Sequence, residues 1–324
     1  MDEQLQGNFL SKRLVVALGA MISCALWGSA FPFVKIGYAL WQIPASDSWT
    51  QVLFAGCRFI IAGLLVILIG SILEHRVLLP RRQALPVICK ISLFQTVLQY
   101  VFFYIGLAHT TGVKGAIIIG SNVFFAILIS CLIFRHEKLT ARKIIGCLIG
   151  FSGIVLVNMS GSALDLNISF LGDGFVLLST IAYSYAAGLM KRHAQAEDPV
   201  LLSGYQFLLG GAAMVLISLL GGGRLTAPSW ASAGVLLYLG FLSAAAYTIW
   251  SLLLKFNPVS QVSVYGFMNP MFGTIFSTLI LREEGLFRPA TALALALVCL
   301  GIWIVNRVPA QAEVPASQGP PSKP

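Results

Sequence analysis

SNVFFAILISCLIFRHE, residues 121–137, has a second copy later in the chain, MNPMFGTIFSTLILREE at residues 268–284. Each copy places an Asn near the start of an apolar run and closes the run on Arg-x-Glu. Matches between apolar residues are common by chance in such runs, whereas an Asn, an Arg and a Glu in one shared register are not. The two stretches therefore indicate an internal repeat.

The repeat extends on both sides of this stretch. A gapless alignment of residues 100–140 with 247–287 matches a set of polar residues: Tyr100 with Tyr247, Asn122 with Asn269, Arg135 with Arg282, and Glu137 with Glu284. Two weaker similarities support the same layout: LWGSAFPFVK (26–35) resembles AYSYAAGLMK (182–191), and RFIIAG (58–63) resembles QFLLGG (206–211). The chain is therefore built of two similar halves.

The composition is that of a membrane protein. Of the 324 residues, 57% are hydrophobic and 10% are charged, against about 25% charged in soluble proteins. Ten windows are nearly free of charge: 14–34, 52–73, 84–108, 115–134, 144–164, 174–190, 199–223, 229–254, 256–281 and 289–306. Each approaches the ~20 residues that a helix needs to cross a bilayer, and continuous apolar runs indicate helices rather than a barrel.

We therefore predict an all-α integral membrane protein with ten transmembrane helices. The windows 174–190 and 289–306 are short, so nine spans remain an alternative to ten. With ten spans and a cytoplasmic N-terminus, fifteen of the 21 Lys and Arg fall on the cytoplasmic side and four on the other. Since cytoplasmic loops carry the excess of Lys and Arg, this count favours two cytoplasmic termini and explains the net charge of +9 without nucleic acid.

Ten spans in two similar halves give five spans to each half. Because five is odd, the second half enters the membrane from the opposite side, and the repeat is inverted, an arrangement typical of transporters. The predicted divisions are a cytoplasmic N-terminus (1–13), a first repeat (14–160), a connecting loop (161–169), a second repeat (170–307) and a disordered cytoplasmic tail (308–324).

Three motifs carry a resemblance to a known family. They are ALWGSAFPFVK in the first span, CRFIIAG in the second, and Glu137 followed by Leu139 and Thr140 after the fourth. Together with the two five-span halves they resemble the EamA family of the drug/metabolite transporter superfamily. The resemblance implies a permease of the cell membrane that exports small metabolites, commonly amino acids or related compounds, through a central cavity between the halves.

Other functions remain as alternatives. A nucleotide-sugar or organophosphate exchanger of the same superfamily would need several basic residues at its cavity. A membrane-embedded enzyme would need a carboxylate cluster, a histidine within the membrane or a metal motif, none of which the sequence contains. We expect neither a catalytic residue nor a metal or other cofactor. The expected partners are a small-molecule substrate and the lipid bilayer, and a coupling proton is left open.

The repeated Asn122 and Asn269 are the first candidates for a substrate site. A buried amide needs a partner, so each Asn either hydrogen-bonds a neighbouring helix or lines a cavity, and the symmetric placement favours the cavity. Pro270 lies beside Asn269 and would break its helix, because proline lacks the N–H of a regular turn. We predict helix breaks or hinges at Pro270 and at Pro32.

Polar residues within the other spans complete the predicted transport path. Arg58 lies well inside the second span, where it is either a snorkelling cation or a path residue that attracts a carboxylate. Its counterpart in the other half is the neutral Gln206. Gln95 and Gln99 share one helix face because they are four residues apart. The remaining path candidates are polar-tipped aromatic residues in the middle of spans: Trp27, Tyr183, Tyr247 and Tyr265.

The closing motif of each repeat copy has a separate prediction. Glu137 and Glu284 follow the C-termini of their helices, where a carboxylate opposes the helix dipole and needs compensation. We predict a structural loop clasp formed by Glu137, Glu284, Arg135 and Arg282, with Arg142, Lys143 and Arg288 as nearby cationic partners. Proton coupling by the two Glu is the alternative role.

Overall fold

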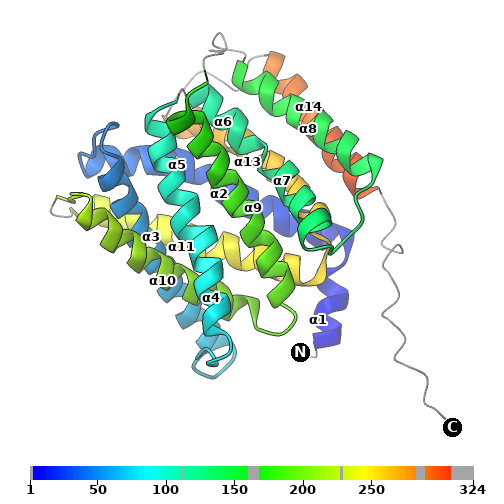
Figure 1. The fold of residues 1–324 in the computed structure, drawn as a ribbon, viewed down its shortest axis with the longest axis horizontal. Coiled ribbons are helices and arrows are strands. Elements are labelled where there is room, and N and C mark those ends of the chain that lie inside the picture. The colour runs from blue at the N-terminus through cyan, green and yellow to red at the C-terminus, as the bar shows by residue number, and fades with distance from the viewer. Residues whose placement is uncertain (1–2, 111, 160–167, 227–228, 282–288, 308–324) are drawn as a thin grey trace.

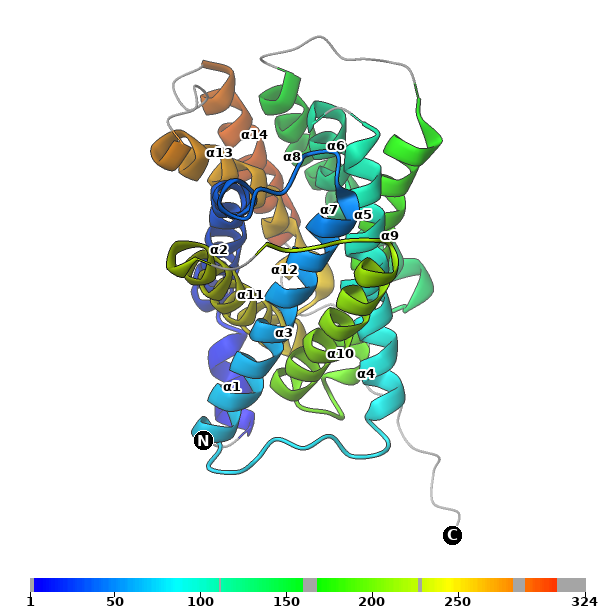
Figure 2. The ribbon, with the colours of Figure 1, turned by 90° about the vertical axis from the view of Figure 1, so that its left-hand side faces the viewer.

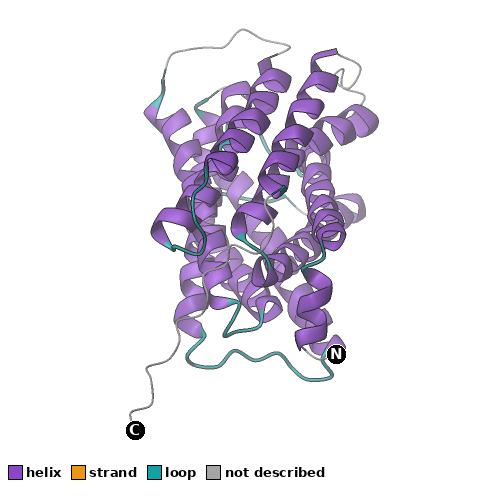
Figure 3. Ribbon diagram, turned by 90° about the vertical axis from the view of Figure 1, so that its right-hand side faces the viewer, coloured by secondary structure: helices purple, strands orange, loops and turns teal. Residues whose placement is uncertain are grey.

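The computed structural model describes residues 3–110, 112–159, 168–226, 229–281 and 289–307. Within these ranges the regular secondary structure is entirely helical (Figure 3). The helices of the first half are α1 (Glu3–Leu10), α2 (Arg13–Leu40), α3 (Ser48–Leu73), α4 (Leu85–Ile91), η1 (Ser92–Leu98), α5 (Gln99–Ala108), α6 (Gly112–Gly120), α7 (Asn122–Leu128), η2 (Ile129–Ile133) and α8 (Ala141–Met159).

The second half has a matching series of helices. They are η3 (Phe170–Gly174), α9 (Phe175–His193), α10 (Pro199–Leu220), α11 (Trp230–Phe256), α12 (Val259–Ser263), η4 (Val264–Phe267), α13 (Met268–Leu281) and α14 (Pro289–Asn306). Short polar or Gly-containing connections separate most of these helices, and α2 alone runs for 28 residues.

Eight stretches of the described chain are helical, long and apolar enough to cross a bilayer: Arg13–Leu40, Ser48–Leu73, Leu85–Ala108, Lys114–Ile133, Phe170–His193, Pro199–Leu220, Trp230–Phe256 and Val259–Leu281. The prediction of an all-helical, multi-pass membrane protein is thus confirmed. The other two predicted windows hold α8 and α14. The described apolar part of α14, Ala292–Asn306, is shorter than a typical span.

Four of these eight stretches contain irregular turns. The third includes the π-helical η1, the fourth has a turn at Ser121 and ends in the π-helical η2, the fifth begins with the π-helical η3, and the eighth contains the 3-10 segment η4 directly before α13. Pro270 lies in the first turn of α13 and follows η4, as expected for a residue that cannot donate to the preceding turn. Pro32 lies inside the uninterrupted α2, so the helix break predicted there is absent from this structure.

Helices α3 and α10, which are equivalent in the repeat, pack closely against each other at one edge of the molecule (Figure 1). A Cβ on Gly63 would lie 2.7 Å from the carbonyl oxygen of Gly204, and one on Gly211 would lie 2.8 Å from that of Gly56. The pairing runs in opposite directions along the two chains, so α3 and α10 are antiparallel. Gly56 and Gly204 occupy equivalent positions of the repeat, as do Gly63 and Gly211, so this seam is nearly symmetric.

Helices α8 and α14 form a second seam of the same kind at the opposite edge (Figure 1). A Cβ on Gly146 would lie 2.9 Å from the carbonyl oxygen of Gly301, and one on Gly153 would lie 2.7 Å from that of Ala294. These helices are therefore antiparallel as well. Small residues at both seams allow the close backbone approach that is common between membrane helices.

Equivalent helices α2 and α9 each pack against helices of the other half. α2 packs against α11 and α13, while its equivalent α9 packs against α5 and α7. α1 lies at one end of the bundle, called here the N-terminal end, and the end opposite to it is called the far end (Figure 2). The core therefore forms between the halves rather than within each of them.

Candidate functional site

A small cavity lies between α9, α11 and η1. Its volume is about 10 Å³, which is at the lower limit for one water molecule. Its walls are formed by Gln95, Tyr183, Ala187, Met190, Trp250, Ser251 and Leu254. Two of the predicted path residues, Gln95 and Tyr183, thus meet across this cavity. Gln95 belongs to the π-helical η1, and such segments frequently occur at functional sites.

Four aromatic residues form a nearly symmetric group beside the cavity, called here the central aromatic cluster: Phe59, Tyr100, Phe207 and Tyr247. Phe59 stacks on its counterpart Phe207, with ring centroids 5.2 Å apart and ring planes inclined by 3°. The hydroxyl oxygens of Tyr100 and its counterpart Tyr247 lie 3.4 Å apart. Phe59 packs on Tyr100 with centroids at 4.6 Å, and Phe207 packs on Tyr247 with centroids at 4.8 Å. The cluster therefore lies where the two halves meet.

Two tryptophans connect the central aromatic cluster to the cavity. The Trp27 ring lies 4.9 Å from that of Tyr247 and 5.0 Å from that of Trp250, measured between centroids. The indole nitrogens of Trp27 and Trp250 are buried and lack a hydrogen-bond partner among the described residues, as does Oε1 of Gln99. Unpartnered buried polar atoms are rare in proteins and call for an explanation such as a ligand or an ordered water.

Arg58 borders the central aromatic cluster. It is 6% exposed, and its guanidinium carbon lies 4.5 Å from the Phe59 ring centroid and 5.7 Å from that of Tyr100. Within the described part of the chain its Nε has no hydrogen-bond partner, and no acidic side chain forms an ion pair with it. Its repeat counterpart Gln206 is fully buried and accepts a hydrogen bond of 2.6 Å from the hydroxyl of Thr96.

The repeated Asn residues lie at the irregular points of their spans. Asn122 is the first residue of α7, directly after the turn at Ser121, and its carbonyl oxygen accepts a hydrogen bond of 2.9 Å from the Ser184 hydroxyl. Oδ1 of Asn122 lies 3.9 Å from where a Cβ on Gly266 would stand, so the side chain faces η4. Oδ1 of Asn269 is buried, with no partner found in the described ranges. Neither Asn is among the cavity-lining residues.

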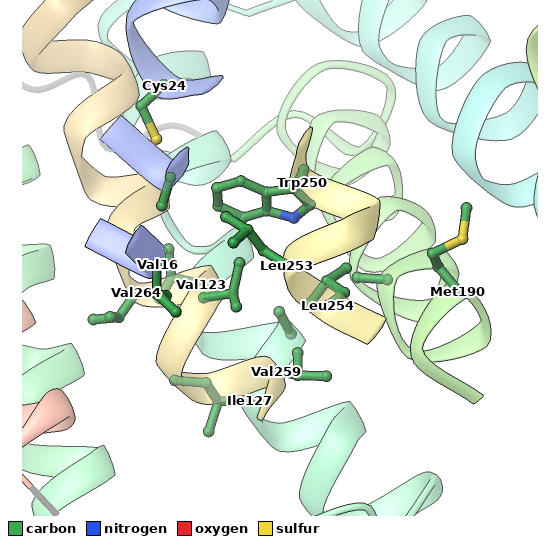
Figure 4. Close-up of a cluster of buried hydrophobic side chains, with 14 of the residues drawn as sticks. Val16, Cys24, Val123, Ile127, Met190, Trp250, Leu253, Leu254, Val259 and Val264 are labelled. Atoms are coloured by element: carbon green, nitrogen blue, oxygen red, sulfur yellow. The ribbon is translucent and has the colours of Figure 1, made fainter. Parts of the chain in front are cut away.

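Tyr265 is placed differently from the other aromatic candidates. It belongs to η4, which packs against α14, and it contacts the large hydrophobic cluster of the core rather than lining the cavity. Figure 4 shows part of that cluster, in which Trp250 and Leu254 of α11 lie near Val123 of α7 and Val259 of α12. These apolar side chains fill the space on one side of the cavity.

Glu137 forms a compact set of polar contacts at the N-terminal end, called here the Glu137 clasp. Its Oε2 accepts a hydrogen bond of 2.7 Å from Nζ of Lys143, in an ion pair whose side chains are 10% and 11% exposed. Its Oε1 accepts bonds of 3.1 Å from the Ser130 hydroxyl and 2.9 Å from the Ser260 backbone N–H. The Ser260 hydroxyl donates a further bond to Oε2. The clasp therefore joins the first half to the start of α12 in the second.

The other predicted members of the clasp are Arg135, Arg282 and Glu284. Arg135 is exposed and adopts a left-handed backbone conformation with φ of 54°, and it is not a partner of Glu137. Arg282 and Glu284 lie outside the described residues. The cationic partner of Glu137 is therefore Lys143, which lies six residues further along the chain, near the start of α8.

The contacts of Glu137 change its acidity. Burial alone would raise the pKa of the Glu137 carboxyl, but hydrogen bonds from Lys143 and Ser260 outweigh burial and lower the pKa below its usual value. A carboxyl whose pKa is lower in the folded than in the unfolded state stabilises the fold above the unfolded pKa of about 4.3. This stabilisation is lost as the pH falls through the folded-state pKa.

Removing the charge of Glu137 is therefore expected to destabilise the protein at neutral pH. Glu137→Gln leaves Lys143 buried without its counter-ion, a change that costs about 3–5 kcal/mol in comparable buried pairs. The melting temperature of the purified protein should fall well below that of the wild type at pH 7, and the gap should narrow as the pH drops below about 4.3. A gap that is constant with pH would contradict this prediction.

Glu74→Gln serves as the matched control for that measurement. Glu74 pairs with Arg76 at 2.6 Å, but the two side chains are 36% and 68% exposed. Exposed pairs contribute less than about 1 kcal/mol, so Glu74→Gln should melt close to the wild type.

The far end has a polar contact of its own. Nζ of Lys114 lies 2.8 Å from Oδ2 of Asp173, with side chains that are 12% and 11% exposed, and the Thr110 hydroxyl donates to Oδ1 of Asp173. This pair connects the start of the span Lys114–Ile133 to the start of the span Phe170–His193. Both ends of the bundle are thus tied by a buried ion pair.

Three residues of these sites were not predicted from the sequence: Phe59, Phe207 and Ser260. Phe59 and Phe207 directly follow Arg58 and Gln206 in the aligned motifs RFIIAG and QFLLGG, so the repeat itself marked them as a symmetric pair. Ser260 carries no comparable signal, because its contact with Glu137 joins segments far apart in the chain.

Comparison with known proteins gives consistent matches along the chain. The model of the EamA-like transporter family matches residues 14–159 and again 170–307. An uncharacterized transporter of Archaeoglobus fulgidus is 25% identical over 92% of this chain and 99% of its own length. The uncharacterized inner membrane transporter YedA of Escherichia coli is 24% identical over 94% of this chain and 97% of its own.

A solved crystal structure shares the fold. It superposes with a TM-score of 0.74 over 90% of this chain and 96% of its own, at 16% sequence identity. At that identity the similarity concerns the fold alone.

Proposed function

Because the chain belongs to the EamA-like transporter family, we propose that it is a secondary-active transporter that moves small metabolites by alternating access. The observation that carries the mechanism is the central aromatic cluster, in which equivalent residues of the two halves meet beside a cavity. A site at the interface of two repeats can be reached from either side when the halves exchange conformations.

The antiparallel seams support an inverted repeat. If the halves were related by rotation about the membrane normal, equivalent helices would run in the same direction. Instead α3 runs against its equivalent α10, and α8 against its equivalent α14. A twofold axis that relates antiparallel equivalent helices is perpendicular to them and lies in the membrane plane, which is the relation expected of inverted halves.

We further propose that α8 and α14 complete ten spans. On this model the first repeat covers residues 14–160 and the second covers 170–307, a division supported by the double match of the family model. Both termini then lie in the cytoplasm, so the N-terminal end of the bundle is the cytoplasmic end. The membrane is the plasma or inner membrane of the cell.

In the proposed mechanism the structure corresponds to an occluded state, in which the central site is closed at both ends of the bundle. The Glu137 clasp holds the N-terminal end together, the Lys114–Asp173 pair holds the far end, and the cavity between them has room for about one water. Opening of the N-terminal end requires that Glu137 release Ser260 of the second half, and opening of the far end requires that Lys114 separate from Asp173. In the proposed mechanism Glu137 helps to close the N-terminal end and Asp173 helps to close the far end. Glu137 then has the structural role rather than the proton-coupling role.

Amino acids or related metabolites are the proposed cargo and export is the proposed direction. An organophosphate exchanger is the second candidate. A diphosphate group would require several cationic side chains, whereas among the described residues at the central aromatic cluster the cation is Arg58. A screen for resistance to toxic amino acids and their analogues, with and without expression of the protein, would identify the cargo for reconstitution.

We expect Asn122→Leu and Asn269→Leu each to abolish transport while the protein still inserts and folds. The amides lie at the irregular points of two spans, where Asn122 faces η4 and Oδ1 of Asn269 has no partner among the described residues, so we propose that both face the transport path. Leucine has a similar size but cannot form a hydrogen bond. The measurement is uptake of radiolabelled cargo into vesicles that contain the reconstituted protein.

Ser152→Leu is the control for this prediction. Ser152 is an exposed residue of α8 whose hydroxyl bonds its own helix at the Ile149 carbonyl, so its replacement should leave the flux unchanged. Wild-type flux from both Asn variants would exclude the proposed role of the two amides.

A further inference from the structure

Arg58 is a buried cation, and no acidic side chain of the described residues forms an ion pair with it. Its side chain is more than nine-tenths buried, and its Nε has no hydrogen-bond partner in the described part of the chain. Removing an ionised group from water costs several kcal/mol unless another group compensates it. Ring faces supply part of that compensation, because the guanidinium lies over Phe59 and Tyr100, but a cation–π contact contributes only about 2 kcal/mol even when desolvated.

The surroundings of Arg58 suit an oxyanion. Three phenols lie close together on this side of the guanidinium: the Tyr100 ring centroid is 5.7 Å from its carbon, the Tyr104 ring is 6.2 Å from that of Tyr100, and the Tyr247 hydroxyl oxygen is 3.4 Å from that of Tyr100. Tyr100 and Tyr104 belong to α5 of the first half and Tyr247 belongs to α11 of the second, so both halves contribute phenols. Phenol and guanidinium groups both donate hydrogen bonds, and together they offer the donors that a carboxylate would accept.

The two acidic side chains in buried ion pairs are already committed. Asp173 pairs with Lys114 at the far end, and Glu137 pairs with Lys143 at the N-terminal end. At the position equivalent to Arg58, Gln206 is neutral and bonds Thr96. Among the described residues at the nearly symmetric centre, the first half thus contributes the positive charge of Arg58, whereas the second half has the neutral Gln206 at the equivalent position.

Building on the proposed transport function, we infer that Arg58 is the fixed counter-charge for a substrate that carries one carboxylate and a compact aromatic or apolar body. The carboxylate binds the guanidinium and the neighbouring phenols, and the body contacts the central aromatic cluster. An amino group, where the substrate has one, meets the ring faces of Trp27 and Trp250, which attract cations. The single charge selects against diphosphates and against purely cationic compounds.

The test uses benzoate and benzamide as probes, because they have nearly the same shape and differ in charge. The full-length protein in detergent is titrated with each compound up to tens of millimolar at constant ionic strength, and its thermal stability is recorded. We expect benzoate to raise the melting temperature in a saturable manner and benzamide to have little effect, with affinities that differ by about tenfold or more. Equal effects of the two probes, or no effect of either, would overturn the inference.

Substitutions then assign the effect to Arg58. Arg58→Gln, which copies the neutral residue of the other half, should weaken benzoate binding by about tenfold or more, and Arg58→Lys should retain part of it. Arg224→Gln removes an exposed positive charge at the far end and should bind benzoate like the wild type. Undiminished benzoate binding by Arg58→Gln would show that residues other than Arg58 bind the carboxylate, which would overturn the inference.

Two further readouts separate the possible failures. If Arg58→Gln does not fold, the Lys variant and the comparison of benzoate with benzamide on the wild type still decide the inference. Binding in detergent does not depend on transport, so selective benzoate binding without flux in vesicles would contradict the proposed function and leave the carboxylate site standing. Flux of a cargo without a carboxylate, unaffected by benzoate, would contradict the inference and leave the transport function standing.

Discussion

Gly63→Ala is expected to destabilise the protein by about 1–3 kcal/mol, the usual cost of overpacking a tight core. The added Cβ would lie 2.7 Å from both the Gly204 carbonyl oxygen and the Leu208 nitrogen. These are backbone atoms of α10, so the helices themselves must separate. Gly211→Ala should cost a similar amount, because its Cβ would meet the backbone of Gly56 and Ile60 at 2.8 Å in the equivalent contact.

Gly234→Ala provides the control, since a Cβ on Gly234 of α11 would meet no atom within 4 Å. Ala in a helix is favoured over Gly by about 0.5–1 kcal/mol, so this variant should melt at or slightly above the wild-type temperature. The measurement is the melting curve of each purified variant. If Gly63→Ala and Gly211→Ala melt like Gly234→Ala, the close antiparallel seam between α3 and α10 is not formed in the protein.

The helices and the meeting point of the halves could be predicted from local pattern. Continuous apolar runs of about 20 residues favour a helix in lipid, because each backbone polar group must be paired within the segment. The gapless register marks Tyr100 and Tyr247 as equivalent residues, and residues related by a twofold axis meet where that axis passes between them. Their hydroxyl oxygens lie 3.4 Å apart.

Contacts that depend on long-range geometry could not be predicted in the same way. Glu137 was expected to have a basic partner nearby and has one in Lys143, but its bonds to Ser260 require the fold. Gln95 and Gln99 were predicted to share a face, yet the cavity is lined by Gln95 and not by Gln99. The π-helical turns of η1 lie between them, and such a turn changes the helical phase on which the four-residue spacing depends.

Tyr265 and Pro32 show the same limit for single residues. A mid-span tyrosine can face a polar path or a packed core, and Tyr265 belongs to the core near α14. Pro32 removes one N–H, but α2 continues through it, because packing against α11 and α13 holds the helix on both sides. Neighbouring helices often compensate a proline within a membrane.

The inverted arrangement of the halves is the central claim, and thiol accessibility tests it most directly. In a variant that lacks the six native Cys, one Cys is introduced either at Lys138 or at Gly285, the matching loops after the two copies of the repeated stretch. Intact cells are treated with a membrane-impermeant thiol reagent, and permeabilised cells serve as the control. The two loops have similar sequences, so their placement on opposite sides requires a repeat with an odd number of spans.

We predict that Lys138→Cys is protected in intact cells and reacts after permeabilisation, whereas Gly285→Cys reacts in both. The first loop carries Arg135, Lys138, Arg142 and Lys143, and the second carries Arg282 and Arg288, which agrees with a cytoplasmic first loop. Equal labelling of the two positions in intact cells, whether both react or neither does, would place the loops on one side. That result would exclude the inverted repeat and remove the basis for alternating access by exchange of the two halves.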